Sequence, residues 1–171
     1  MHASISRALG GALVVLALPW PIASHAQAPL DVSLTAHRVV VDARGRESLR
    51  PGDRAKPGEL VEYRAAYRNA GALALRKVEA TLPIPAGTEY LARSARPAPA
   101  LASVDGQRFE PLPLKRLVRR PDGREELQEV PASEYRFLRW SLGAIEGRTT
   151  QTVRARVRVS SAVAAATAER R

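Results

Sequence analysis

Apolar and polar residues alternate along most of this chain, in short stretches that glycine and proline separate. The most regular stretch lies near the C-terminus and alternates four aliphatic residues with three arginines: Val153, Ala155, Val157 and Val159 with Arg154, Arg156 and Arg158. Successive side chains of a β-strand point to opposite faces of its sheet, so this spacing gives one apolar and one charged face. We therefore predict a half-buried strand whose arginines face outward.

Similar stretches predict strands at residues 30–41, 61–68, 77–82, 88–92, 101–104 and 135–142. The residues predicted to share an apolar face are Val32, Leu34 and Ala36 in the first of these strands, Tyr63 and Tyr67 in the second, and Leu138, Trp140 and Leu142 in the last. Short strands between turn signals are typical of a two-sheet sandwich. The chain is therefore predicted to be all-β.

The turn motifs occur in a fixed order: Lys56-Pro57-Gly58, Asn69-Ala70-Gly71, Leu82-Pro83-Ile84-Pro85-Ala86-Gly87 and Trp140-Ser141-Leu142-Gly143. Over roughly residues 51–159, this order resembles the bacterial repeat family known as domain of unknown function 11. The resemblance implies an immunoglobulin-like two-sheet sandwich of about seven strands. It also implies a protein that is exported or displayed at the cell surface, here with a single copy of the repeat, and it implies no reaction.

The first 26 residues are expected to be a signal peptide, removed from the mature protein. A short basic start precedes an apolar run at 8–18, and the small residues Ser24 and Ala26 stand where signal peptidase reads the chain. The run is shorter than the ~20 residues that a permanent membrane span needs. We expect a periplasmic or secreted product with no transmembrane anchor after signal cleavage, a domain at 27–159 and a disordered tail at 160–171.

An insertion at about 107–134 departs from the family pattern and carries the signature of a β-hairpin. Residues 114–120 and 124–130 flank the turn sequence Pro121-Asp122-Gly123. With a two-residue loop, three arginine–glutamate pairs face one another across the strands: Arg120 with Glu125, Arg119 with Glu126 and Arg116 with Glu129, and Val118 faces Leu127. With a three-residue loop, the facing pairs are Leu117 with Leu127, Arg119 with Glu125 and Arg120 with Arg124. We prefer the first register, because opposite charges across an antiparallel pair are stabilising.

The charge balance favours anionic partners. The formal net charge is +10 at pH 7, and such a surface attracts anions over long distances. After export these would be acidic polymers or lipid head groups rather than nucleic acid. The possible partner surfaces are the hairpin and the arginine row of the last strand, with Arg116, Arg119, Arg120, Arg124, Arg154, Arg156 and Arg158 as their basic residues. For the hairpin, a simple extension of one sheet is the alternative; for the row, a solvated outer face is the preferred interpretation.

The residues give little support to catalysis. The chain has no Cys, and His37 is the only histidine after the predicted signal peptide, so neither a zinc site nor a Ser-His-Asp triad is expected. We predict a non-enzymatic protein without cofactor or metal. It would be a structural or protein-interaction module of the cell envelope, whose partner is another envelope protein. The alternative is a module that binds anionic envelope polymers or lipids through its Arg-rich strand or hairpin.

Overall fold

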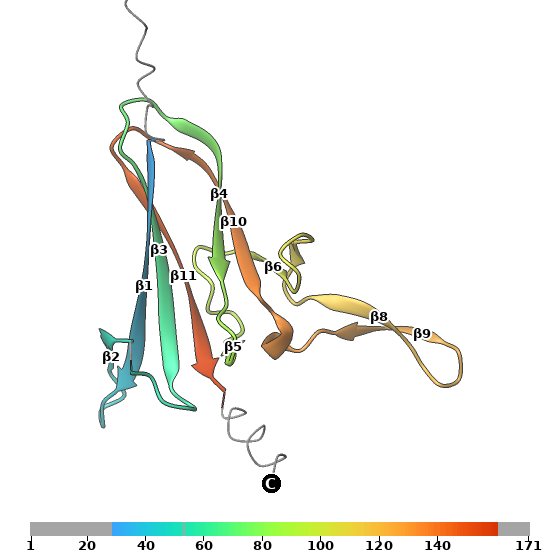
Figure 1. Cartoon of the computed structure of the whole chain (residues 1–171). Helices are drawn as coiled ribbons and strands as arrows, with labels where there is room; N and C mark the ends of the chain where they lie inside the picture. The colour runs from blue at the N-terminus through green and yellow to red at the C-terminus, as the bar shows by residue number, and fades with distance from the viewer. Residues whose placement is uncertain (1–28, 53, 161–171) are drawn as a thin grey trace, which may run out of the picture.

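The structure is a computed structural model that describes residues 29–52 and 54–160. The predicted signal peptide lies outside the described residues, as does the predicted tail apart from Ser160. The described part of the chain is all-β, as predicted, and its strands form three antiparallel sheets (Figure 1). A short 3-10 turn, η1 (Ala132–Glu134), is its one helical element.

The largest sheet contains, in spatial order, β2 (Glu47–Pro51), β1 (Leu30–Val41), β3 (Leu60–Asn69), β11 (Thr150–Val159) and β5 (Thr88–Tyr90). The second contains β4 (Leu75–Pro83), β10 (Phe137–Ile145), β6 (Leu101–Ser103) and β7 (Glu110–Pro111). The third consists of β8 (Lys115–Arg119) and β9 (Glu125–Glu129) alone. The third sheet extends away from the other two (Figure 1).

The two larger sheets share one apolar core. From the first sheet it receives the inward rows of β3 and β11, and from the second the inward residues of β4 and β10. Trp140 is 2% exposed, and its indole N–H donates a hydrogen bond of 2.7 Å to the carbonyl of Pro97. Tyr67 and Leu138 are buried beside it in the same cluster. The core faces predicted for 61–68, 135–142 and 153–159 are therefore confirmed, with Tyr63, Leu142 and Val159 half-buried at the margin.

The N-terminal half of β1 is less buried than its alternation predicts. Val32 and Leu34 lie opposite Tyr67 and Ala65 of β3, on the inner face of the sheet, yet they are 55% and 51% exposed. The reason is the offset of the two sheets. β4 contacts β3 and β10 contacts β11, so the second sheet ends before it covers this part of β1.

The strand β2 was not predicted, and β10 continues past its predicted end. β2 pairs with β1 although its sequence gave no strand signal. Gly143, predicted to end its strand, lies inside β10 with a φ of +69°, and the register with β4 shifts on both sides of it. Glycine adopts this left-handed conformation without steric cost, which lets the strand form a bulge and continue to Ile145.

The open edge of the second sheet, β4, is blocked against further strand pairing. The hydroxyl of Tyr67 donates to the carbonyl of Thr81 (3.2 Å) and accepts from its N–H (3.0 Å). A side chain from the first sheet thus occupies backbone groups that another strand would need. Pro83 at the end of β4 has no N–H to offer. Natural sheets commonly protect their edges in such ways.

Candidate functional site: a protruding arm

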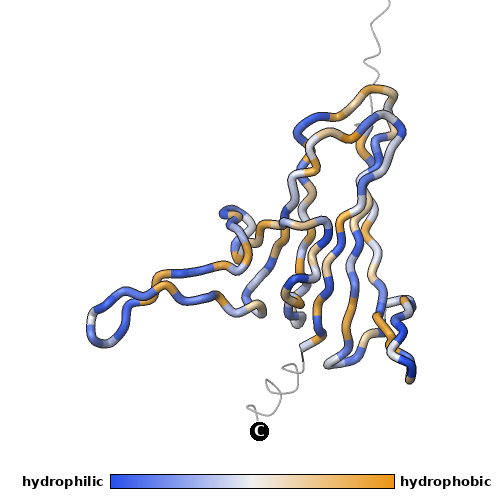
Figure 2. The backbone as a smooth tube through the Cα atoms, turned by 180° about the vertical axis from the view of Figure 1, so that it is seen from behind, coloured by the Kyte–Doolittle hydropathy of each residue, from blue (hydrophilic) through white to orange (hydrophobic). Residues whose placement is uncertain are grey.

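We call residues 115–129, which comprise β8, β9 and the turn between them, the arm. In the part of the chain that the structure describes, no other strand pairs with β8 or β9. Figure 2, seen from behind, shows the arm extending sideways from the body of the molecule. Its side chains are mostly exposed on both faces. The arm therefore does not extend one of the two larger sheets, which was the alternative interpretation of the insertion.

The register of the arm is the three-residue alternative, and the preferred two-residue register is wrong. Leu117 lies opposite Leu127 and Arg119 opposite Glu125. The N–H of Gly123 donates to the carbonyl of Arg120 (2.9 Å), and Gly123 has a φ of +83°. This is a turn with proline in its second position followed by a left-handed glycine, a common three-residue loop.

Proline explains why the shorter loop fails. A two-residue loop would make Pro121 and Arg124 the closing pair, and Pro121 has no N–H with which to complete it. The longer loop places Pro121 inside the turn, where its fixed φ is favourable. The closing bond then runs from the N–H of Arg120 to the carbonyl of Arg124, at 2.8 Å. Backbone geometry outweighs the charge pairs, because each such pair contributes only about 0.2–1 kcal/mol.

The ion pairs of the arm differ accordingly from those predicted. Arg120 pairs with Glu126 rather than Glu125. Arg116 does not face Glu129; its guanidinium donates to both carboxylate oxygens of Glu134 in η1, at 2.7 and 3.1 Å. This two-pronged contact ties the arm to the body.

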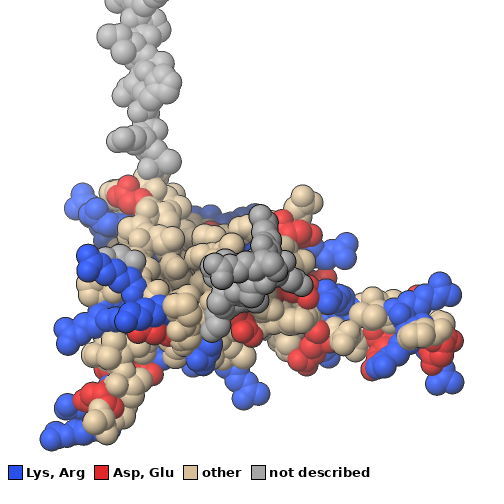
Figure 3. All heavy atoms as spheres, turned by 60° about the horizontal axis from the view of Figure 1, so that its bottom comes forward, with Lys and Arg blue, Asp and Glu red and all other residues tan. Residues whose placement is uncertain are grey.

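The other two arginines of the arm that were predicted as partner residues, Arg119 and Arg124, make weaker contacts within the arm. Arg119 lies opposite Glu125 in the register, and Arg124 approaches Asp122 at 3.9 Å. Both signs of charge therefore occur along the arm, as Figure 3 shows.

An exposed apolar pair lies at the middle of the arm. Leu117 and Leu127 face one another across β8 and β9, and they are 60% and 65% exposed. On the same face, Lys115 lies opposite Glu129 on one side of the pair and Arg119 opposite Glu125 on the other. On this face the two leucines therefore lie between two pairs that each join a cation and a carboxylate. The predicted contact of Val118 with Leu127 does not form, because Val118 lies opposite Glu126.

The base of the arm belongs to the core. Leu114 and Val130 are buried, and the N–H of Val130 donates to the carbonyl of Leu114 at 2.9 Å. The hydroxyl of buried Tyr135 accepts a hydrogen bond from the N–H of Leu114 (3.0 Å), and its ring stacks on Tyr90 with 6.0 Å between the centroids. The free arm therefore begins after Leu114 and ends before Val130.

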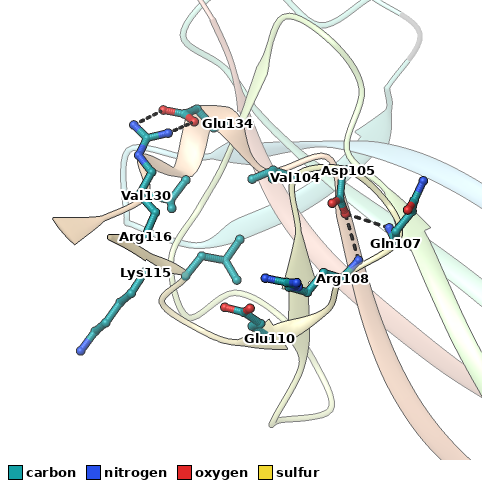
Figure 4. Close-up of a pocket in the computed structure, with 10 residues that line it drawn as sticks. Val104, Asp105, Gln107, Arg108, Glu110, Lys115, Arg116, Val130 and Glu134 are labelled. Atoms are coloured by element: carbon teal, nitrogen blue, oxygen red, sulfur yellow. Dashed lines mark hydrogen bonds and ion pairs between the residues drawn. The ribbon is translucent and has the colours of Figure 1, made fainter. Parts of the chain in front are cut away.

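A cavity of about 610 Å³ lies beside this base, between β8 and the loop after β6 (Figure 4). Val104, Leu114 and Val130 give it an apolar lining. Asp105 accepts hydrogen bonds from the N–H groups of Gln107 and Arg108, and these bonds lower the pKa of its carboxyl. Asp105 thus stabilises its own loop. The cavity adds a recess to the surface around the arm.

The three arginines of β11 occupy a different surface from the arm, on the outer face of the largest sheet. Their outward direction was predicted correctly, but Arg154 and Arg156 do not form a simply solvated row. Both contact the carboxylate of Glu62 on β3, which is 2% exposed, at 3.7 and 2.9 Å. Arg64 donates to the same carboxylate at 2.7 Å. Arg158 donates to the carbonyl of Gly58 (3.3 Å).

Burial raises the pKa of Glu62, but hydrogen bonds from Arg156 and Arg64 outweigh it and hold this pKa below its usual value. Arg156 also binds both oxygens of Glu47 on β2, at 2.9 and 2.8 Å, and these two glutamates raise its pKa. The sequence predicted charged residues on both strands, but it did not predict that Glu62 would be buried. Knowledge of the pairing of β3 with β11 would have brought Glu62 opposite Arg156.

Two further features bear on function, namely metal-binding clusters and membrane-spanning helices. Within residues 29–52 and 54–160, no group of three or more His, Cys, Asp or Glu side chains is placed to hold a metal ion. His37 is half-buried in β1. No helix among the described residues is long and apolar enough to cross a membrane. In comparisons with known proteins, no family model, curated protein or solved structure matches this chain.

Proposed function

We propose that this chain is an exported, non-catalytic, immunoglobulin-like domain that serves as an interaction module of the cell envelope, and that the arm is the surface that captures its partner, another protein. Export and the family are supported by the sequence signals at 1–26 and 51–159. The observation that supports partner binding by the arm is its exposed Leu117–Leu127 pair on a sheet of only two strands. Two-stranded sheets are marginally stable in water unless something packs on them.

The contacts of the arginines favour a protein partner over an anionic polymer. Arg116 and Arg120 of the arm are held by glutamates, as are Arg154 and Arg156 of β11. An incoming anion would have to compete with these carboxylates. The leucine pair, in contrast, is exposed, and apolar contacts with a protein would remove it from water.

The test replaces residues 115–129 with the turn sequence Asn-Gly. Leu114 and Val130 are already hydrogen-bonded to each other, so a two-residue turn can join them and leave the core intact. We expect the shortened protein to fold and to lose capture of envelope proteins in pull-downs from the source cells.

A second variant, Leu117→Ser with Leu127→Ser, should lose the same partners while keeping the arm. Its matched control is Val32→Ser, which removes another half-exposed apolar side chain, in β1 and outside the arm. This control should keep the partners. Undiminished capture by the shortened protein would contradict the proposal.

A further inference from the structure

Among the described residues, the two strands of the arm each have one unpaired edge. The closing bonds at its two ends, between Arg120 and Arg124 at the tip and between Leu114 and Val130 at the base, fix which residues pair through the backbone. In an antiparallel ladder such pairs alternate with pairs whose N–H and C=O groups point away from each other. Leu117 and the leucine opposite it form a pair of the second kind. The backbone groups of Leu117 therefore point outward, at the free edge of β8.

The free edge of β8 presents a cation, a leucine and a cation. Lys115, Leu117 and Arg119 alternate with the residues that bond to β9, so the backbone groups of all three point outward. Their side chains share one face of the arm, and Leu117 is 60% exposed. Among the described residues, Lys115 and Arg119 form no ion pair, unlike Arg116 and Arg120. This edge therefore offers backbone bonds, an apolar contact and two charges to an added strand.

An antiparallel strand on this edge would contact all three side chains. Antiparallel addition continues the pairing within the arm, and it is slightly more stable per residue than parallel pairing. Directly opposite residues of an antiparallel pair carry their side chains on the same face. Three alternate residues of the incoming strand would therefore lie opposite Arg119, Leu117 and Lys115 in turn.

The charges of the arm select an acidic strand and direct it to β8. Carboxylates opposite Lys115 and Arg119 would form attractive pairs, and an apolar residue between them would pack on Leu117. Cations at the same positions would be repelled. The free edge of β9 presents Glu125 and Glu129, so it repels the acidic strand that β8 attracts. Attraction at one edge and repulsion at the other together give specificity.

The charge of the whole chain acts in the same direction. The formal net charge is +10 at pH 7, and Arg7 is the one basic residue that lies in the predicted signal peptide. A protein with this balance attracts acidic segments over long distances and repels basic ones. It also repels a second copy of itself. An acidic segment of a different protein is therefore favoured over a basic segment or another copy of this chain.

The base of the arm has room for the incoming chain to continue. Because β8 runs from the base to the tip, an antiparallel strand runs from the tip to the base. Its C-terminal end reaches Lys115, which lines the cavity of about 610 Å³ beside the base (Figure 4). Val104, Leu114 and Val130 line the same cavity. An apolar residue that follows the acidic stretch can thus contact an apolar lining.

We propose that the free edge of β8 binds an acidic, extended segment of another protein as a third, antiparallel strand. The segment carries two carboxylates at alternate positions on either side of one apolar residue. The inference rests on the proposed function and names the chemistry of the partner. Addition of a strand to an exposed sheet edge is a common mode of peptide recognition. A third strand would also stabilise the arm, because a sheet of two strands is only marginally stable in water.

Peptides with blocked termini test this inference against the purified protein. The acidic probe is Thr-Glu-Thr-Val-Thr-Glu-Thr, and the basic probe has lysine in place of both glutamates. A rearranged probe, Thr-Glu-Glu-Thr-Val-Thr-Thr, keeps the composition but points its two carboxylates to opposite faces. In NMR titrations we expect the acidic probe to bind most tightly and to shift the amide signals of Lys115, Leu117 and Arg119. The N–H of Leu117 should also become protected from hydrogen exchange.

Several results of these titrations would overturn the inference. The acidic probe might fail to bind, or bind no more tightly than the basic or the rearranged probe. It might also bind while the amide of Leu117 stays unshifted and unprotected. Finally, the same three signals might shift when the protein alone is concentrated, which would make a second copy the occupant of the edge.

Variants locate the charges that select the segment. Lys115→Gln with Arg119→Gln should weaken binding of the acidic probe about 2- to 30-fold, the factor that two cross-strand charge pairs supply. The matched control, Arg120→Gln with Arg124→Gln, removes as many charges from the turn of the arm and should keep the preference for the acidic probe. Equal losses in the two variants would mean that net charge, and not the edge of β8, selects the probe, which would overturn the inference.

The peptide titrations and the pull-downs can fail independently. A protein that needs its arm to capture an envelope protein, but does not prefer the acidic probe, refutes the inference and leaves the proposed function standing. A protein that binds the acidic probe at β8, but captures its envelope partners equally well after replacement of the arm by Asn-Gly, refutes the proposed function.

Discussion

Replacing Glu62 with glutamine should destabilise the fold and remove part of its dependence on pH. The carboxylate of Glu62 accepts close hydrogen bonds from Arg64 and Arg156, at 2.7 and 2.9 Å, and it is almost fully buried. Net contributions of hydrogen bonds to charged groups are about 1.5–3 kcal/mol each. The guanidinium groups remain partly exposed, which reduces this value. Glutamine keeps one accepting oxygen but turns an NH₂ group towards a cation, so we expect a total cost of about 2–3 kcal/mol.

The pH dependence has a definite sign. Burial raises the pKa of Glu62, but the hydrogen bonds from Arg156 and Arg64 together outweigh it, so this pKa is lower in the folded protein than its ordinary value. The stability that it contributes is therefore complete above the pKa of the unfolded chain and is lost as pH falls through the lower folded pKa. Protonated Glu62 resembles glutamine, so the difference in unfolding free energy between parent and Glu62→Gln should shrink in acid.

Urea unfolding at neutral pH and at several acidic pH values measures both effects. Glu89→Gln is the matched control, because Glu89 lies on the same face of the largest sheet, is exposed, and stands opposite Arg158 in the register. Its unfolding free energy should stay within about 0.5 kcal/mol of the parent. Equal midpoints for parent and Glu62→Gln at neutral pH, or a difference that grows in acid, would refute the reasoning.

Three further predictions concern stability. Trp140→Ala should cost about 3–5 kcal/mol in denaturant titration, since it empties the centre of the core, and a midpoint equal to the parent's would contradict the faces assigned to β10. His37→Ala should change the unfolding free energy by less than about 1 kcal/mol, because this side chain is only half-buried. At the base of the arm, Leu114→Ala should cost about 2–3 kcal/mol. Leu117→Ala, three residues further along, should stay within about 0.5 kcal/mol, and similar costs for these two would mean that the boundary of the arm is misplaced.

Alternation was sufficient to predict most of the strands and their faces, because a strand fixes side-chain direction locally. It placed Trp140 and Tyr67 in the core and the arginines of β11 outside it. Burial depends in addition on what lies opposite, which a strand's own sequence does not contain. Val32 and Leu34 have the correct direction but are about half-exposed, because no strand in the described part of the chain covers them. Glu62 has the outward direction and is nevertheless buried, beneath arginines from its own and the adjacent strand.

The candidate site was also predicted only in part. A hairpin with charges of both signs could be recognised from the residues, and so could the two registers open to it. The choice between registers depended on a backbone property of Pro121, its missing N–H, and not on the charges that favoured the shorter loop. The inner limits of the arm also depended on distant residues, since Leu114 is buried against Tyr135. Local sequence therefore identified the arm but not which of its residues are free to act.

The two sets of arginines show why the same residue type predicts different functions in different places. On β11, carboxylates from β2 and β3 already occupy the guanidinium groups of Arg154 and Arg156. An anion that binds there must separate existing ion pairs, one of them with a buried glutamate, and separating such a pair is costly. On the arm, Arg119 and Arg124 are more open, and the surface also exposes outward backbone groups and two leucine side chains. Groups of these kinds suit an extended strand, which supports the proposal of a polypeptide partner over that of an anionic polymer.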